Sequence, residues 1–113
     1  MKRVKNNYMA YMKSLVFCLN KIVEDGYTAH FSINDQGILD DATQKQYTAE
    51  QVKVITFFQF EGRDHPGENA VLYVLETIDG MKGTLVDAFE RFTDSLANRF
   101  ILHVQKLAHS RTS

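Results

Sequence analysis

Charged and polar side chains that could do chemistry gather between two apolar segments, directly after residue 60. Two acids, a cation and an imidazole occur close together there, as Glu61, Arg63, Asp64 and His65. Such a set could bind a polar ligand or transfer a proton. A Pro-Gly pair at 66–67 favours a turn, so a polar hairpin loop is the other interpretation of the same residues.

Asp87 is the remaining candidate ligand-binding residue. Asp79-Gly80 between alternating apolar runs predicts a two-residue type I′ turn. That register places Asp87 opposite Leu72, on an apolar face of the sheet. Because a bare buried carboxylate costs several kcal/mol, it must be paired, hydrogen-bonded or protonated. It could accept a structural hydrogen bond from the start of the last helix, or act as an acid or base beside the 62–69 loop.

No pattern in the chain favours a metal site or a cofactor. The only cysteine is Cys18, which excludes an intrachain disulfide and a zinc site built on several cysteines. We expect Cys18 to be a small core residue. Asp40 and Asp41 lack the ligand spacing of a calcium loop. His103 and His109 do not have the spacing of a helical metal pair, and we expect both to be surface residues.

Periodic apolar side chains indicate which elements position these candidates. Spacings of three and four predict helices over Tyr8–Asp25 and Ser95–Ala108, although the second helix could already begin at Asp87. Alternation predicts strands over Tyr27–Ile33, Ile38–Leu39, Val52–Glu61 and the two arms of a hairpin within Ala70–Phe89. In Val52–Glu61 the alternation places Val52, Val54, Thr56, Phe58 and Phe60 on one face.

Local signals refine this outline. Thr48 and Gln51 fit a capping box, which predicts a single helical turn before the long strand. Gly83 inside a strand indicates a bulge. The polar residues 40–46 favour a loop. We therefore predict an α+β fold with an N-terminal helix, a mainly antiparallel sheet of four to five strands and a C-terminal helix. One domain spans 1–113, with residues 1–7 and 110–113 frayed.

One set of residues carries a resemblance to a known family. They are Phe60-Glu61-Gly62, Asp64, Asn69, Leu72-Tyr73, Asp79-Gly80, Lys82-Gly83, Leu85-Val86-Asp87-Ala88 and Asp94-Ser95. Between Gly26 and Leu107 the chain resembles a family of short uncharacterised bacterial proteins. Members of that family often carry the name phosphoribosylpyrophosphate synthetase. What the resemblance implies is mainly the fold, a single domain of about this length.

Composition excludes several classes of partner. The 13 basic and 14 acidic residues give a formal net charge of −1, which argues against nucleic acid as the main partner. No apolar run approaches the length that crosses a bilayer, so we expect no membrane partner. With one cysteine and no recognisable signal peptide, we expect a cytoplasmic protein.

Two classes of function remain open. The first is a non-enzymatic binding or regulatory module that self-associates as a homodimer. It rests on strands that are apolar on both faces, with only two helices to cover them. The second is a small enzyme or ligand carrier whose polar site comprises the 61–69 loop and Asp87. The sequence does not identify a small-molecule ligand for that site.

Overall fold

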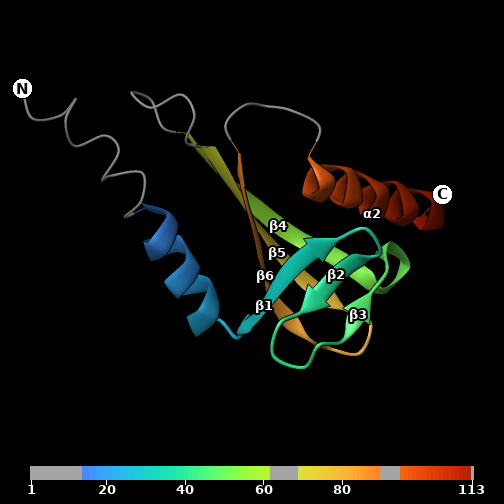
Figure 1. The fold of residues 1–113 in the computed structure, drawn as a ribbon, viewed down its shortest axis with the longest axis horizontal. Coiled ribbons are helices and arrows are strands. Elements are labelled where there is room, and N and C mark those ends of the chain that lie inside the picture. The colour runs from blue at the N-terminus through green and yellow to red at the C-terminus, as the bar shows by residue number, and fades with distance from the viewer. Residues whose placement is uncertain (1–13, 62–68, 90–94, 113) are drawn as a thin grey trace, which may run out of the picture.

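The computed structural model describes residues 14–61, 69–89 and 95–112. A six-stranded sheet with the order β3-β2-β1-β6-β5-β4 forms its centre (Figure 1). The strands are β1 (Ala29–Asn34), β2 (Gly37–Asp40), β3 (Gln46–Tyr47), β4 (Val52–Glu61), β5 (Asn69–Thr77) and β6 (Lys82–Phe89). A helix over 14–24 precedes the sheet, a 3-10 turn η1 (Ala49–Gln51) precedes β4, and helix α2 (Leu96–Thr112) follows β6.

The predicted α+β class is confirmed, but the sheet differs from the prediction in two ways. It has six strands rather than four to five, and it is mixed because β1 runs parallel to β6. The additional strand, β3, lies in a segment whose residues are mostly polar. Pairing with β2 buries Tyr47 to 1% exposure. A strand of two residues is too short to produce an alternating pattern. The capping box of Thr48 and Gln51 is present as predicted.

The parallel contact between β1 and β6 depends on a glycine. Gly83 lies opposite Ala29, and a Cβ at position 83 would collide with the backbone carbonyl of Ala29. The prediction of a bulge at Gly83 is therefore wrong, and the ladder between β5 and β6 runs without interruption. Close approach of a second backbone is the reason for glycine here.

The bulge lies instead in β4, at Ile55. Val54 pairs with Leu75 and Thr56 pairs with Val74, so one extra residue is inserted between them. This insertion exchanges the two faces of β4. Val52 and Val54 lie on the α2 side of the sheet, whereas Phe60 packs with the cluster under helix 14–24. The prediction of one continuous face from Val52 to Phe60 is therefore wrong.

The β5–β6 hairpin also differs from its predicted register by one residue. The N–H of Thr77 donates to the Met81 carbonyl at 2.8 Å, which leaves a loop of Ile78, Asp79 and Gly80. Only Gly80 in this loop has a positive φ, of 90°. This is the three-residue hairpin loop with glycine at the left-handed position, rather than a type I′ turn. Asp87 consequently lies opposite Val71 and not Leu72.

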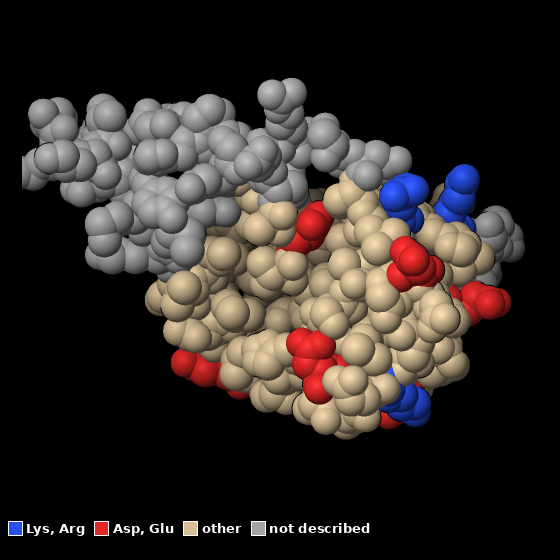
Figure 2. Space-filling view, viewed as in Figure 1, with Lys and Arg blue, Asp and Glu red and all other residues tan. Residues whose placement is uncertain are grey.

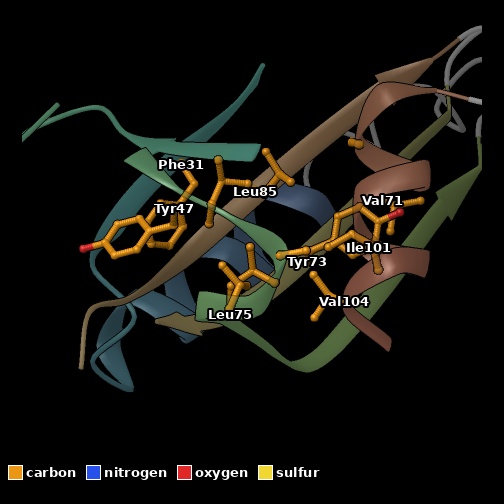
Figure 3. Packing of buried hydrophobic residues seen from close by; sticks show 12 residues of the cluster. Phe31, Tyr47, Val71, Tyr73, Leu75, Leu85, Ile101 and Val104 are labelled. Atoms are coloured by element: carbon orange, nitrogen blue, oxygen red, sulfur yellow. The ribbon is translucent and has the colours of Figure 1, made fainter. Parts of the chain in front are cut away.

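Each face of the sheet carries its own helix. Ile101 and Val104 of α2 pack beside Val71 and Tyr73 of β5 in the larger core (Figure 3). On the opposite face, Ile22 of helix 14–24 packs on Leu72 and Val74, with Leu15, Cys18, Leu19, Tyr27 and Phe60 around them. A helix on both faces satisfies the requirement of a strand that is apolar on both sides. Among the described residues, no helix is long and apolar enough to cross a membrane.

Burial of β5 gives a direct test of this packing. Leu75 is fully buried in the α2-side core, so Leu75→Ala should lower the free energy of unfolding by about 2–5 kcal/mol. Leu102 is 55% exposed on α2, so Leu102→Ala should cost less than about 0.5 kcal/mol. Denaturant titration of both variants measures the difference. Equal losses would contradict the placement of β5 at the centre of the sheet.

Candidate functional site: polar clusters and an exposed strand edge

Most of the residues predicted to form a polar site lie outside the described residues. Arg63, Asp64 and His65 belong to the stretch 62–68, which the structure does not describe. Glu61 is the last residue of β4. Asp87 alone can be placed with its contacts, on the α2 side of β6.

Asp87 joins its strand to the start of α2. The Ser95 hydroxyl donates to Asp87 Oδ2 at 2.8 Å, and Ser95 Oγ in turn accepts the N–H of Asn98 at 3.0 Å. Ser95 is therefore the N-terminal cap, and the helix begins at Leu96 rather than near Asp87. The negative charge of the carboxylate is favourable beside a helix N-terminus. This geometry supports the structural interpretation of Asp87.

The charge of Asp87 also affects the pKa of the neighbouring Tyr73. Burial raises the pKa of Tyr73 from its usual value, and the nearby charge of Asp87 raises it further. Tyr73 is only 6% exposed and its ring lies 6.3 Å from the ring of Phe57. With this raised pKa, Tyr73 remains a neutral phenol at ordinary pH.

A second polar cluster was not predicted from the sequence. The carboxylate of Asp79, in the β5–β6 turn, receives hydrogen bonds from Lys45 Nζ at 2.6 Å, Tyr47 Oη at 3.0 Å and Thr77 Oγ1 at 2.5 Å. From the sequence, Asp79-Gly80 predicts a turn through the backbone preferences of the two residues alone. The partners of Asp79 on and beside β3 are far away in the sequence, and no local pattern indicates them.

The electrostatics of this cluster favour a structural role. Hydrogen bonds from Lys45 and Thr77 hold the pKa of Asp79 well below its usual range. The hydrogen bond to Asp79 and the charge of its carboxylate raise the pKa of Lys45. Burial, followed by the hydrogen bond to Asp79, raises the pKa of Tyr47. All three groups thus stay in their usual charge states near neutral pH, so the cluster is poorly suited to proton transfer.

An open groove of about 360 Å³ lies between the β1–β2 turn and α2. Phe100 and Leu96 line it, with Arg99 and His103 on the same helix and Asp35 on the turn. The groove contains charges of both signs. In the part of the chain that the structure describes, no three His, Cys, Asp or Glu side chains come together in a way that could hold a metal ion.

The long strand β4 exposes large apolar side chains at the end of the sheet. Ile55, Phe57 and Phe58 are 39%, 51% and 40% exposed. We call these three residues the β4 edge. Phe58 and Val86 flank the buried Leu72 in one row across three strands, and Val86 is also 42% exposed. Apolar surface of this kind is typical of interfaces.

Charge is distributed differently from apolar surface. In the view of Figure 2, acidic and basic side chains are scattered, and neither sign gathers into a patch. That face therefore lacks the clustered basic surface that phosphate groups require.

Comparisons with known proteins add no identification. No protein-family model, no curated protein and no solved structure matches this chain.

The Asp79 cluster predicts a pH dependence of stability. A carboxylate whose pKa is lower in the folded state stabilises the fold above its unfolded pKa of about 3.9, and this contribution is lost as the pH falls below that value. Asp79→Asn should therefore be less stable than the wild type at pH 7, and the gap should narrow below about pH 4. Lys45→Gln breaks the same ion pair and should behave alike. A gap that is constant from pH 7 to pH 3 would contradict the ion pair.

The N-terminal cap of α2 predicts that two substitutions of Ser95 lower the free energy of unfolding by different amounts. Ser95→Ala removes the acceptor for the Asn98 N–H and the donor to Asp87, so it should lower the free energy of unfolding by about 0.5–2 kcal/mol. Ser95→Thr keeps the hydroxyl and should lose clearly less. Thermal or denaturant unfolding measures both. If threonine and alanine have the same effect, the hydroxyl does not link β6 to α2.

Proposed function

We propose that this protein is a small non-enzymatic binding module that self-associates through the β4 edge. The observation that carries the proposal is the exposure of Ile55, Phe57 and Phe58, at 39%, 51% and 40%, on a strand with no partner beyond it in the described sheet. Phe57 and Phe58 project to opposite faces of β4, and exposed apolar side chains of this size are costly in water and typical of association surfaces.

The polar clusters support the same proposal indirectly. The hydroxyl of Ser95 donates a hydrogen bond to Asp87 Oδ2, and three side chains donate hydrogen bonds to the carboxylate of Asp79. Both carboxylates contribute to the fold through these bonds. Within the described residues, each carboxylate is held by side-chain donors, as is typical of a structural group.

Each face of the sheet carries a helix, α2 on one and helix 14–24 on the other. The sequence predicts a dimer because only two helices are available to cover strands that are apolar on both faces, whereas the present proposal places the contact at the edge of the sheet. Self-association through an edge also leaves the groove beside α2 open to solvent.

We place this module in the bacterial cytoplasm. Cys18 is a free thiol whose pKa is raised by partial burial, which suits a core residue in a reducing compartment. The resemblance to short bacterial proteins over Gly26–Leu107 supports the source.

Light scattering across a dilution series tests self-association. The expected mass is twice 13.0 kDa at high concentration, falling towards 13.0 kDa on dilution. Phe57→Lys should weaken association by about tenfold or more, because it places a charge within the apolar contact. Leu102→Lys changes a side chain of similar exposure on α2 and should leave association unchanged. A mass of 13.0 kDa at every concentration would refute the proposal.

A further inference from the structure

Two Asp-Gly pairs occur in the chain, at 25–26 and at 79–80, and both lie in exposed turns. Asp-Gly is the dipeptide in which aspartate isomerises most readily, because glycine has no side chain to hinder its own backbone nitrogen. A Cβ at Gly26 or Gly80 would meet no described atom within 4 Å, so neighbouring groups do not crowd either turn. Both pairs are therefore open to this reaction.

Isomerisation begins when the glycine nitrogen attacks Cγ of the preceding aspartate. A bond forms between that nitrogen and Cγ, and the carboxyl OH leaves as water together with the amide proton, which closes a succinimide ring. Water then adds to the ring. If it breaks the bond between the nitrogen and the original backbone carbonyl carbon, the chain continues through the side chain as isoaspartate, with no net change in mass. The first step requires a protonated carboxyl group that is free to approach the nitrogen.

The backbone around the two pairs is closely matched. Gly26 has a φ of 102° and Gly80 has a φ of 90°. The N–H of Gly26 donates to the Val23 carbonyl at 3.0 Å, and the N–H of Gly80 donates to the Thr77 carbonyl at 3.0 Å. Since the attacking nitrogen is held alike in both turns, the partners of the two carboxylates determine which pair reacts faster.

The two carboxylates differ sharply in these partners. Three side chains donate hydrogen bonds to the carboxylate of Asp79: Lys45, Tyr47 and Thr77. The bonds from Lys45 and Thr77 also hold the pKa of Asp79 well below its usual range. Within the described ranges, the exposed carboxylate of Asp25 accepts no hydrogen bond. To react, Asp79 must leave its donors and gain a proton, whereas Asp25 needs the proton alone.

We propose that Asp25 is a site of isoaspartate formation, and that the side chains of Lys45, Tyr47 and Thr77 protect Asp79 from the same reaction. The first part assigns a modification site at the end of helix 14–24. The second part gives the Asp79 cluster a chemical role in addition to its structural one. Neither part depends on how the protein associates.

Isomerisation of Asp25 would alter the end of helix 14–24. The N–H of Gly26 bonds to the Val23 carbonyl and the N–H of Tyr27 bonds to the Ile22 carbonyl at 3.2 Å, which is the Schellman pattern of a helix C-terminus. Isoaspartate places one additional carbon in the backbone between these donors and the helix, so both bonds are displaced. Because Ile22 packs on β5, the modification loosens the cover of that face of the sheet.

Peptide mapping of the aged protein tests the proposal. Trypsin releases the two Asp-Gly pairs in separate peptides, 22–45 and 64–82, in which chromatography and electron-transfer fragmentation identify isoaspartate. In the folded protein, isoaspartate should form at least about tenfold faster at Asp25 than at Asp79, because each hydrogen bond that must break lowers the rate several-fold. In concentrated urea, where the donors are lost, the two rates should agree to within about threefold. Equal rates in the folded protein, or no isoaspartate at Asp25 while the unfolded chain reacts, would overturn the proposal.

Variants of the donors test the protection of Asp79. Lys45→Gln removes the cation, and Tyr47→Phe removes one hydroxyl donor but keeps the buried ring. Each should raise the rate of isomerisation at Asp79 by about threefold or more and leave the rate at Asp25 unchanged. Lys53→Gln is the matched control, because Lys53 is an exposed lysine outside the cluster, and it should change neither rate. If neither donor variant changes the rate at Asp79, the protective role is overturned.

A conservative variant tests the assignment of the modification site. Asp25→Glu keeps the negative charge, but ring closure would have to form a six-membered ring, which is far slower. The isoaspartyl form of peptide 22–45 should therefore disappear in this variant, while the rate at Asp79 stays the same. If the isoaspartyl form of that peptide persists, the modification lies at another aspartate and the assignment of Asp25 is overturned.

Discussion

The structure depends on one constraint: β5 is apolar on both faces and cannot be exposed to water on either. Leu72 is fully buried and Val74 is 2% exposed on the side of helix 14–24, and Leu75 is fully buried on the α2 side. One helix must therefore lie on each face, and strands must flank β5 on both sides. Helix 14–24, α2, β4 and β6 all satisfy this requirement, and each occupies a different side of β5.

The sheet consists of two antiparallel halves, β3-β2-β1 and β6-β5-β4, which are joined by the parallel pairing of β1 with β6. β1 and β6 share a parallel register of three residue pairs, beginning at Gly83. The Asp79 cluster adds a second connection, because it joins the β5–β6 turn to Lys45 and Tyr47 at β3. The buried ring of Tyr47 and the ion pair between Lys45 and Asp79 thus fix the position of the short strand β3.

The sequence predicted the elements whose patterns are long, and failed where distant residues decide the structure. Val52–Glu61 was predicted with its observed bounds because ten alternating residues leave little ambiguity. The bulge at Ile55 and the three-residue turn at Asp79 each shift a register by one position, and neither changes the composition of a strand. The sequence predicted that Asp87 could accept a hydrogen bond from the start of the last helix, but not that the Ser95 hydroxyl donates it, and the Lys45–Asp79 pair had no local signal.

Protection of the β4 backbone amides is the most direct test of the central claim, that the protein associates through the β4 edge. The N–H of Ile78 donates to the Gln51 carbonyl, so alternate residues of β5, including Leu72, direct their backbone groups towards β4. The N–H of Phe58, opposite Leu72, therefore bonds to β5 and is an internal reference, whereas the N–H groups of Phe57 and Gln59 point outward. Hydrogen exchange measured at high and low protein concentration should slow at Phe57 and Gln59 by more than about tenfold in the associated state, and change little at Phe58. Exchange at Phe57 and Gln59 that is independent of concentration, in a protein that does associate, would show that the contact lies elsewhere.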